Sequence, residues 1–373
     1  MQLKSLFIVF VLGVISHHVF GQAYQFEDVI KIDALPVISQ DKTGTCWSYS
    51  TTSFLESEII KKTGKRIDLS EMYPVKNNYN LKAENYILRQ GKAQFDEGAL
   101  AHDILNSMEK YGLMPVDAYS GLEGGMTTHN HAEMVEVMKS VLDAYLKNPN
   151  KKLSNKWRTV IPFILDAYLG AAPNEFQYNG VKYTPKSFKD MTTLSKDDYT
   201  TLTSFTHVPF YTSTILSIPD NFSNGSMYNV PMTTMTDAVD HALKNGYTVA
   251  LDCDVSEPTF SAKYGVAVIP ANAQDNEMIL KEIKPEQTIT QAMRQEGFEA
   301  LTTTDDHLMH IVGTVKDQKG NTYYKVKNSW GSNPEKVANQ GYIYMSKPYF
   351  QLKTISVLLN KNALSDDLKS KVK

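Results

Sequence analysis

The sequence contains little cysteine: Cys46 and Cys253 are the only two in 373 residues. Two thiols form one disulfide at most, which excludes a disulfide-rich scaffold. Their surroundings differ. Cys46 ends a polar stretch of small residues, whereas Cys253 lies in the apolar run 247–255, which predicts a buried strand and a structural thiol. A single bridge between them stays open at this stage.

Excess basic charge is also absent, since the chain has 38 Lys and Arg and 41 Asp and Glu, which gives a net charge of −3. Nucleic-acid binding normally needs a clearly basic face, so we expect no nucleic-acid partner. No group of residues has the spacing of a metal site, and we expect none. Internal repeats and low-complexity tracts are missing as well.

Long hydrophobic runs are confined to the N-terminus. Lys4 precedes the apolar run Leu6–Ile15, and Val19 and Gly21 are small residues at the positions a signal peptidase requires. The pattern predicts a signal peptide over 1–21, with export to the periplasm or the medium. An uncleaved anchor is the alternative, but ten residues are too few, because spanning needs about 20. We expect no membrane span after cleavage.

Apolar spacing predicts helices in the first half of the chain and strands in the second. From Cys46 an apolar stripe of i, i+4 type predicts a helix that ends at Gly64. Further helices are predicted near 79–90, 98–111 and 235–245, and strands over 247–255, 308–316, 322–328 and 341–346. This order indicates an α+β fold in two lobes. The predicted parts are a helical lobe (about 36–120), an insertion (about 121–236), a β-rich lobe (about 237–360) and a C-terminal tail (361–373).

Cys46 is the candidate nucleophile. At the start of a helix, unpaired N–H groups and the positive end of the dipole favour the thiolate. A thiolate that attacks a carbonyl needs a base that later protonates the leaving amine. Gln40, six residues upstream, carries an amide that can donate to a developing oxyanion.

His307 and Asn328 are the candidate base and its orienting partner. His307 precedes an apolar, strand-like run, and Asn328 opens Asn-Ser-Trp-Gly at the end of the next strand. A hairpin through 317–321 would set the two side by side. Asn328 would then bind one imidazole nitrogen and leave the other for Cys46.

Polar neighbours of His307 are predicted to have other roles. The spacing to Gly313 and to the Asn-Ser-Trp-Gly segment favours His307 over His310, which we expect to pack in the core. Asp305 and Asp306 are expected to be solvated loop charges.

Together, Gln40, Cys46-Trp47, His307 and Asn-Ser-Trp-Gly resemble the papain-type cysteine peptidases. The chain departs from that pattern twice. Thr43 stands where the family has its first cysteine, and His307 follows Cys46 by 261 residues, against about 130–150 in the usual signature. Both departures are similar to the bleomycin hydrolase/aminopeptidase C branch, which lacks the papain disulfides and carries a large insertion. Five further segments are similar to that branch: 69–73, 95–99, 110–115, 184–188 and 253–255.

The resemblance implies a peptidase that acts through a thioacyl intermediate on Cys46. It implies His307 as general acid–base, Asn328 as its orienter and Gln40 as oxyanion donor, with no cofactor. Two alternatives stay open: a catalytically silent binding protein of the same fold, and an unrelated Cys/His acyl-transfer enzyme such as a cell-wall amidase.

The resemblance also suggests residues that bind the peptide substrate. Gly98 would present its backbone to the extended chain, and Trp330 would cover the His–Asn pair. Glu97 replaces one glycine of the family's pair, and its carboxylate could favour a basic substrate group.

Members of the branch are typically aminopeptidases whose C-terminal arm lies in the cleft, and they tend to form closed hexamers. Here the tail 361–373 lacks the usual Pro/Trp approach and ends in lysines. We expect a surface helix rather than an arm. Aminopeptidase action is therefore implied by the resemblance, with an endopeptidase of open cleft as the alternative, and a homo-oligomer is implied by the resemblance alone.

Overall fold

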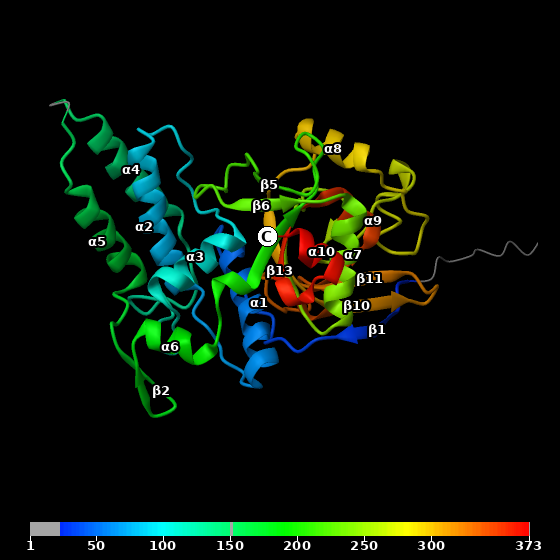
Figure 1. The fold of residues 1–373 in the computed structure, drawn as a ribbon, viewed down its shortest axis with the longest axis horizontal. Helices are drawn as coiled ribbons and strands as arrows, with labels where there is room; N and C mark the ends of the chain where they lie inside the picture. Colours follow the sequence, from blue (N-terminus) through cyan, green and yellow to red (C-terminus); the bar gives the residue numbers. More distant parts are fainter. Residues whose placement is uncertain (1–22, 150–151, 373) are drawn as a thin grey trace, which may run out of the picture.

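The computed structural model describes residues 23–149 and 152–372, so the predicted signal peptide lies outside it. It is an α+β fold (Figure 1). The helices are α1 (Cys46–Thr63), α2 (Met72–Leu88), α3 (Ala101–Tyr111), α4 (Ala132–Leu146), α5 (Trp157–Leu169), α6 (Pro185–Thr192), α7 (Met232–Lys244), α8 (Gln291–Glu299), α9 (Lys347–Lys353) and α10 (Asp366–Lys371). The strands are β1 (Phe26–Lys31), β2 (Phe176–Tyr178), β3 (Val181–Tyr183), β4 (Tyr199–Thr203), β5 (Thr212–Ile215), β6 (Ser226–Asn229), β7 (Val249–Cys253), β8 (Phe260–Ser261), β9 (Val266–Ala267), β10 (His307–Asp317), β11 (Thr322–Lys327), β12 (Tyr342–Ser346) and β13 (Thr354–Asn360).

One large sheet runs in the order β5-β6-β4-β13-β7-β10-β11-β12-β9-β8, with β1 added to β10. Strand β10 pairs with β7, β11 and β1. Gly313 makes the last pairing possible, because a side chain there would place Cβ 2.0 Å from the carbonyl oxygen of Ile30. The predicted hairpin between β10 and β11 is confirmed.

Helices cover both faces of the sheet. Alternate residues of a strand point to opposite faces. Ala250 and Leu308 pack in the core that α1, α2 and α3 share, whereas Leu251 and Met309 pack in the core that α7 and α9 share. Strand β7 is therefore buried along its whole length, which explains its apolar sequence and the burial of Cys253.

The predicted insertion 121–236 divides between the two lobes. Its first part supplies α4 and α5, which extend the helical lobe (Figure 1). Its second part supplies β4, β5 and β6, which form one end of the large sheet. The segment 216–225, between β5 and β6, returns toward the helical lobe and contacts α3.

Helix α1 begins and ends where the sequence predicts. Gly64 closes it in the left-handed region at φ +70°, and its N–H donates to Ile60 O at 2.8 Å. Three other helices start elsewhere than predicted: α2 and α7 start earlier, and α3 starts later. Pro74 fits the first turn of α2, where its missing N–H costs nothing. Helix α3 starts late because the Asp103 carboxylate accepts from Leu100 N at 3.0 Å and fixes the start there.

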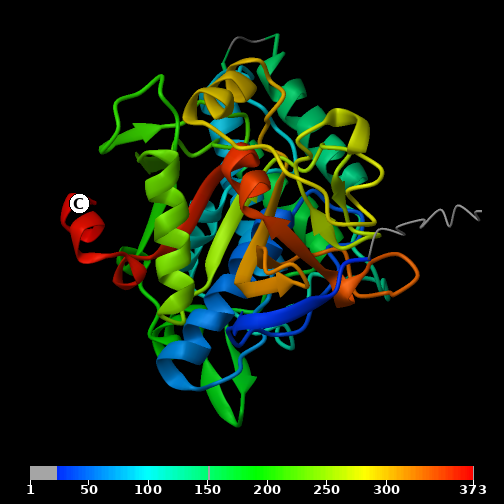
Figure 2. The ribbon, with the colours of Figure 1, turned by 90° about the vertical axis from the view of Figure 1, so that its right-hand side faces the viewer.

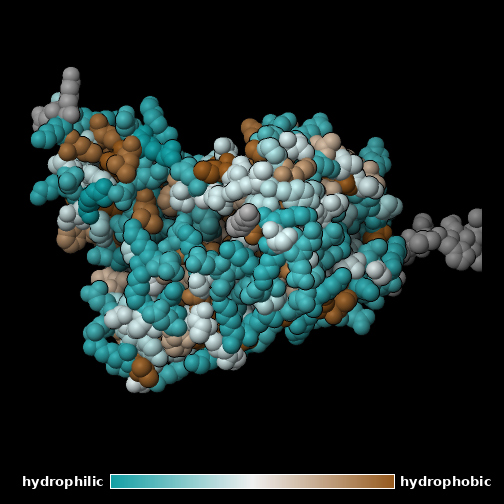
Figure 3. Space-filling model, viewed as in Figure 1, coloured by the Kyte–Doolittle hydropathy of each residue, from teal (hydrophilic) through white to brown (hydrophobic). Residues whose placement is uncertain are grey.

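The C-terminal tail is a surface helix, as predicted. Leu364, Leu368 and Val372 are buried in the core that contains α7, and Figure 2 shows α10, in red, at the edge of the molecule beside α7. The face of Figure 3 is mainly hydrophilic, with apolar groups gathered over the end formed by α4 and α5. Within residues 23–149 and 152–372, no helix is long and apolar enough to cross a bilayer.

Candidate active site

Cys46 is the first residue of α1, and hydroxyl groups on α1 hold that helix against β10. Ser50 Oγ donates to Met309 O at 2.6 Å, and Ser53 Oγ lies 3.0 Å from His310 Nδ1. The thiol is 8% exposed and is hydrogen-bonded to the backbone of Leu308. These contacts bring Cys46 to the start of β10, where His307 lies. Cys46 and Cys253 are both free thiols, so no bridge joins them.

His307 and Asn328 meet as the hairpin predicts. His307 Nε2 lies 2.8 Å from Asn328 Oδ1, and Ser329 N donates to the same oxygen at 2.7 Å. The backbone donor identifies this atom as the amide oxygen, so His307 Nε2 carries the proton. In the neutral ring, Nδ1 then holds the free lone pair that a general base needs.

Trp330 covers the imidazole of His307. Their ring centroids are 4.9 Å apart. The ring of Phe260 meets the indole of Trp330 edge-on, with the centroids 5.8 Å apart. Trp330 is itself 39% exposed, while His307 is 4% exposed. The indole therefore separates the His307–Asn328 hydrogen bond from solvent.

Burial favours the neutral form of both reacting groups. It raises the pKa of the Cys46 thiol to about 12, to which the charges of Asp305, Asp220 and Asp252 contribute. It lowers the pKa of His307 to about 4, although the hydrogen bond that His307 donates to Asn328 acts in the opposite direction. Burial therefore opposes the thiolate that the start of the helix favours. A helix dipole is worth about 0.3–1 kcal/mol at a surface, whereas one pKa unit is about 1.4 kcal/mol, so burial dominates.

Gln40 is held in place on both sides of its amide. Its Oε1 accepts from Ser329 Oγ at 2.6 Å, and its Nε2 donates to Thr43 O at 2.6 Å. The primary amide has two N–H groups, so one hydrogen remains for a second acceptor. The arrangement is compatible with the predicted oxyanion donor, because the Thr43 carbonyl oxygen, which can only accept, identifies which end of the amide is the nitrogen.

Glu97 already has an internal partner. Its Oε2 accepts from Gly44 N at 2.5 Å, and its carbonyl oxygen accepts from Trp47 Nε1 at 3.0 Å. Both donors belong to the segment around Cys46. Glu97 thus orders the loop that presents the nucleophile, and one oxygen of its carboxylate is already used in doing so.

Gly98 lacks the open face that was expected for it. Its carbonyl oxygen accepts from Lys82 Nζ. The carboxylate of Asp220 lies against its α-carbon, where an added Cβ would be 1.9 Å from Asp220 Oδ2. The segment that carries Asp220 therefore covers the backbone at which an extended substrate was expected to bind.

Sequence reasoning missed three carboxyl groups beside the nucleophile: those of Asp220, Asp252 and Asp305. Asp305 was expected to be a solvated charge. Instead its carboxyl is hydrogen-bonded to that of Asp252, and burial raises its pKa to about 7. Asp306 is exposed, as expected. An acidic residue inside the buried strand 247–255 was the available signal for Asp252, whereas nothing in the polar stretch around Asp220 distinguishes it.

A second acidic group surrounds Lys327, next to Asn328. Carboxyl oxygens of Glu56, Asp68 and Glu71 lie within 4.8 Å of one another, a spacing that could hold a cation. The Lys327 ammonium is close enough to lower the pKa of each of these carboxyls, and it donates to Ser53 Oγ at 2.7 Å. Lys327 therefore supplies the positive charge that this group requires.

Comparisons with known proteins agree with this geometry. Residues 169–373, more than half of the chain, match the family model described as Peptidase C1-like family. "Cysteine proteinase 1, mitochondrial" of Saccharomyces cerevisiae (strain ATCC 204508 / S288c) is 25% identical over 398 residues, covering 93% of this chain and 79% of that protein. "Aminopeptidase C" of Listeria monocytogenes is 23% identical, covering 89% of this chain and 81% of that protein.

Solved structures support the fold. The crystal structure of PepW from Lactobacillus rhamnosis HN001 superposes with a TM-score of 0.72 at 20% identity, covering 93% of this chain and 84% of that one. The predicted α+β class and papain-like architecture are thus confirmed, and an unrelated Cys/His acyl-transfer enzyme is excluded. The chain belongs to the Peptidase C1-like family and is a cysteine peptidase.

Proposed function

We propose that this peptidase is an aminopeptidase that removes residues from the N-terminus of peptides. The observation that carries the proposal is the coverage of Gly98 by Asp220. A polypeptide that extended past the scissile residue along Gly98 would collide with the 216–225 segment. A substrate whose chain ends there, in a free amine, would fit. The names of the Listeria relative and of "Aminopeptidase G" from Lactobacillus delbrueckii subsp. lactis, 23% identical, agree with this.

The reaction starts from a neutral Cys46 thiol and a neutral His307 imidazole. As Cys46 Sγ attacks the carbonyl carbon, the thiol proton moves to His307 Nδ1, and the imidazolium that forms is stabilised by the Asn328 oxygen on Nε2. The carbonyl oxygen becomes an oxyanion, toward which Gln40 can direct its remaining N–H. No charged pair has to be maintained before substrate binds, which is consistent with the burial of both groups.

After the attack, His307 acts first as an acid and then again as a base. The tetrahedral intermediate collapses, the C–N bond breaks, and His307 gives its proton to the leaving amine. The acyl group is left on Cys46 Sγ. Water then gives a proton to His307 and attacks the thioester carbon. Collapse releases the carboxylic acid of the cleaved residue and returns the proton to Cys46.

The test compares a free-amine aminoacyl amide with its N-acetylated form. An aminopeptidase cuts the free amine with a kcat/KM at least tenfold higher. Equal cleavage of both would support the endopeptidase alternative. Cys46→Ala serves as the control for contaminating activity.

Two further predictions concern export and assembly. We propose that the chain is exported through a signal peptide over 1–21, on the strength of Lys4 and the run Leu6–Ile15. N-terminal sequencing of the secreted or periplasmic protein should begin at Gln22. The hexamer that the resemblance implies is tested by the mass of the purified protein in sedimentation.

A further inference from the structure

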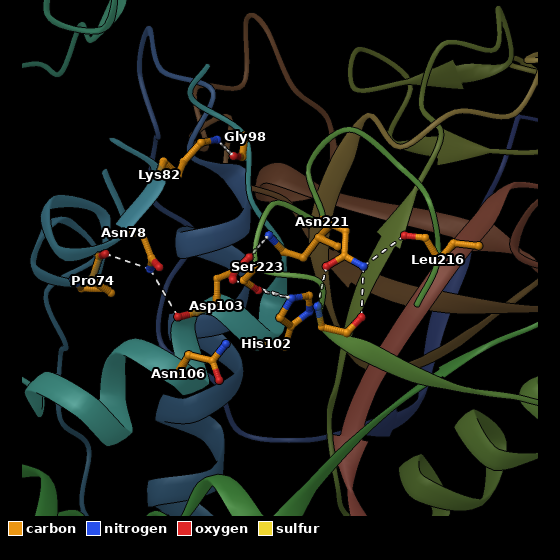
Figure 4. A network of polar contacts seen from close by, with 12 residues as sticks. Pro74, Asn78, Lys82, Gly98, His102, Asp103, Asn106, Leu216, Asn221 and Ser223 are labelled. Carbon is orange, nitrogen blue, oxygen red and sulfur yellow. Dashed lines mark hydrogen bonds and ion pairs between the residues drawn. The ribbon is translucent and has the colours of Figure 1, made fainter. Parts of the chain in front are cut away.

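The 216–225 segment is fixed in place against the helical lobe. Asn221 is 6% exposed; its Nδ2 donates to Leu216 O and Gly225 O, both at 3.0 Å, and its Oδ1 accepts from Gly225 N at 2.8 Å. Ser223 Oγ lies 3.0 Å from His102 Nε2 on α3 (Figure 4). These bonds fix the segment against α3, and they set the position of Asp220.

The carboxylate of Asp220, which lies against Gly98, has few hydrogen-bond donors among its neighbours. Among the described residues, its one hydrogen-bond donor is Gln94 Nε2, at 3.4 Å from Oδ1. Lys82 is near enough to lower its pKa, but the Lys82 ammonium donates to the carbonyl oxygen of Gly98. Figure 4 shows this Lys82–Gly98 contact above the α3 network. The carboxylate therefore has hydrogen-bonding capacity left for another donor.

Two further carboxyls act on the thiol, and because they share a proton they add one negative charge between them. Asp252 is 2% exposed, and it shares a hydrogen bond with Asp305. Within the described part of the chain, no other donor reaches Asp252 Oδ1 or Asp305 Oδ2. The charges of both, like that of Asp220, act on Cys46. Lys82 acts on both Asp220 and Asp305, so three carboxyls share one ammonium, and a cationic ligand would offset the remaining negative charge.

The C-terminal tail does not provide another group that could bind such a cationic ligand. Ala363 O lies 2.8 Å from His241 Nδ1 on α7, and Lys371 Nζ lies 5.0 Å from the ring centroid of Tyr211. Leu368 is buried among the residues of the α7 core. The described tail is thus bound to the outer side of the β-rich lobe, away from Gly98 and Cys46.

We propose that Asp220 is the specificity-determining residue that accepts the α-ammonium of the substrate. This inference rests on the aminopeptidase proposal and adds the group that recognises the amine. The ammonium donates to the carboxylate beside Gly98, and the Asp252–Asp305 pair supplies further negative charge. An N-acetyl group removes the positive charge and places extra atoms against Asp220, so a blocked substrate is disfavoured twice.

The placement also couples binding to catalysis. Three carboxyls near Cys46 oppose formation of the thiolate. A bound ammonium offsets their charge, so the thiol ionises more easily when a correct substrate is present. Burial raises the pKa of Asp220 to about 6, so the fraction of the carboxylate that can bind an ammonium declines below that pH.

The experiment measures kcat/KM of the full chain for alanine p-nitroanilide and for N-acetylalanine p-nitroanilide, in wild type and in Asp220→Asn. We expect a fall of at least tenfold for the free amine and no fall for the blocked substrate. The acid limb of the free-amine pH profile, near pH 6, should disappear in the variant. Asp220→Glu, which keeps the charge, should recover part of the preference.

Controls distinguish a failure of the Asp220 inference from a failure of the aminopeptidase proposal. Asp190→Asn changes an exposed carboxylate elsewhere in the insertion and should behave as wild type. The stoichiometry of Cys46 alkylation by iodoacetamide shows whether the site of each variant is intact. If wild type cuts both substrates equally, the aminopeptidase proposal fails. If wild type prefers the free amine and Asp220→Asn keeps the same preference and acid limb, only the role of Asp220 is overturned.

Discussion

The side-chain oxygen of Asn328 lies 2.8 Å from His307 Nε2 and accepts from the backbone N–H of Ser329 at 2.7 Å. The second contact fixes the amide, and the amide fixes the imidazole tautomer. A ring held in this way presents Nδ1 as its base, so the position of one backbone N–H decides which nitrogen reacts.

Replacement of Asn328 by alanine should lower kcat without a matching change in KM. The ring would lose the acceptor that orients it and that stabilises the imidazolium. We therefore expect kcat to fall roughly 10–10³-fold. In a catalytic triad, losing the orienting residue so that the wrong tautomer forms lowers kcat by up to about 10⁴. The measurement is steady-state kinetics on a free-amine substrate. Asn333→Ala, at an exposed turn in the same region, should leave both constants unchanged. An Asn328→Ala enzyme with normal kcat would show that the pair is only structural.

Gln40→Glu tests the oxyanion donor. The variant keeps an oxygen for the Ser329 hydroxyl but loses the Nε2 donor. We expect kcat to fall about 10²–10³-fold, the usual cost of one oxyanion donor. KM should change little, because the oxyanion forms only after binding. A change confined to KM would argue that Gln40 positions the ground-state substrate instead.

The stability of the protein should depend on the ionisation of Asp220. Its pKa in the fold is about 6, above the ordinary 3.8, because of burial. A raised carboxyl pKa means that the fold favours the protonated form, so this contribution to stability is full below about pH 4 and is lost as pH rises through 6. Asp220→Asn should therefore raise the melting temperature at pH 8 by a few degrees, with a difference that vanishes near pH 4.

Calorimetry at pH 4, 6 and 8 measures this difference directly. The isosteric change leaves the 216–225 segment with its Asn221 bonds. A variant that is less stable than wild type at pH 8 would mean that attraction to Lys82 outweighs the cost of burying the charge.

The C-terminal helix should affect stability but not specificity. Leu368 is 3% exposed in the α7 core, and its replacement by alanine should cost about 2–5 kcal/mol of unfolding free energy. The preference for free over blocked amines should stay as in wild type. Removal of Lys373 alone should also leave the preference unchanged. If that deletion abolished the preference, the end of the chain, and not Asp220, would set where the amine binds.

Much of the site follows from the sequence because its parts lie on regular elements. The apolar stripe after Cys46 predicts α1, and the turn at 317–321 predicts the hairpin that joins His307 to Asn328. Both rest on local periodicity and turn chemistry. The same kind of reasoning finds strand β7 from its apolar run.

The protonation states and the amine site could not be predicted in this way. A helix start favours a thiolate, but the burial of Cys46 and the charge of Asp252 depend on packing between segments some 200 residues apart. Asp220 reaches Gly98 only because β5 and β6 join the end of the sheet and turn their connecting segment back onto α3. No local pattern around Asp220 encodes that contact.

The central claim is that Cys46 is the nucleophile, and the most direct measurement is the turnover of Cys46→Ala together with its melting temperature. Mutation of the thiol in the first turn of α1 removes a single sulfur atom, so the fold should remain and the melting temperature should change little. The account predicts that hydrolysis of the free-amine substrate falls to the uncatalysed rate. Hydrolysis that persists in the folded variant would contradict it.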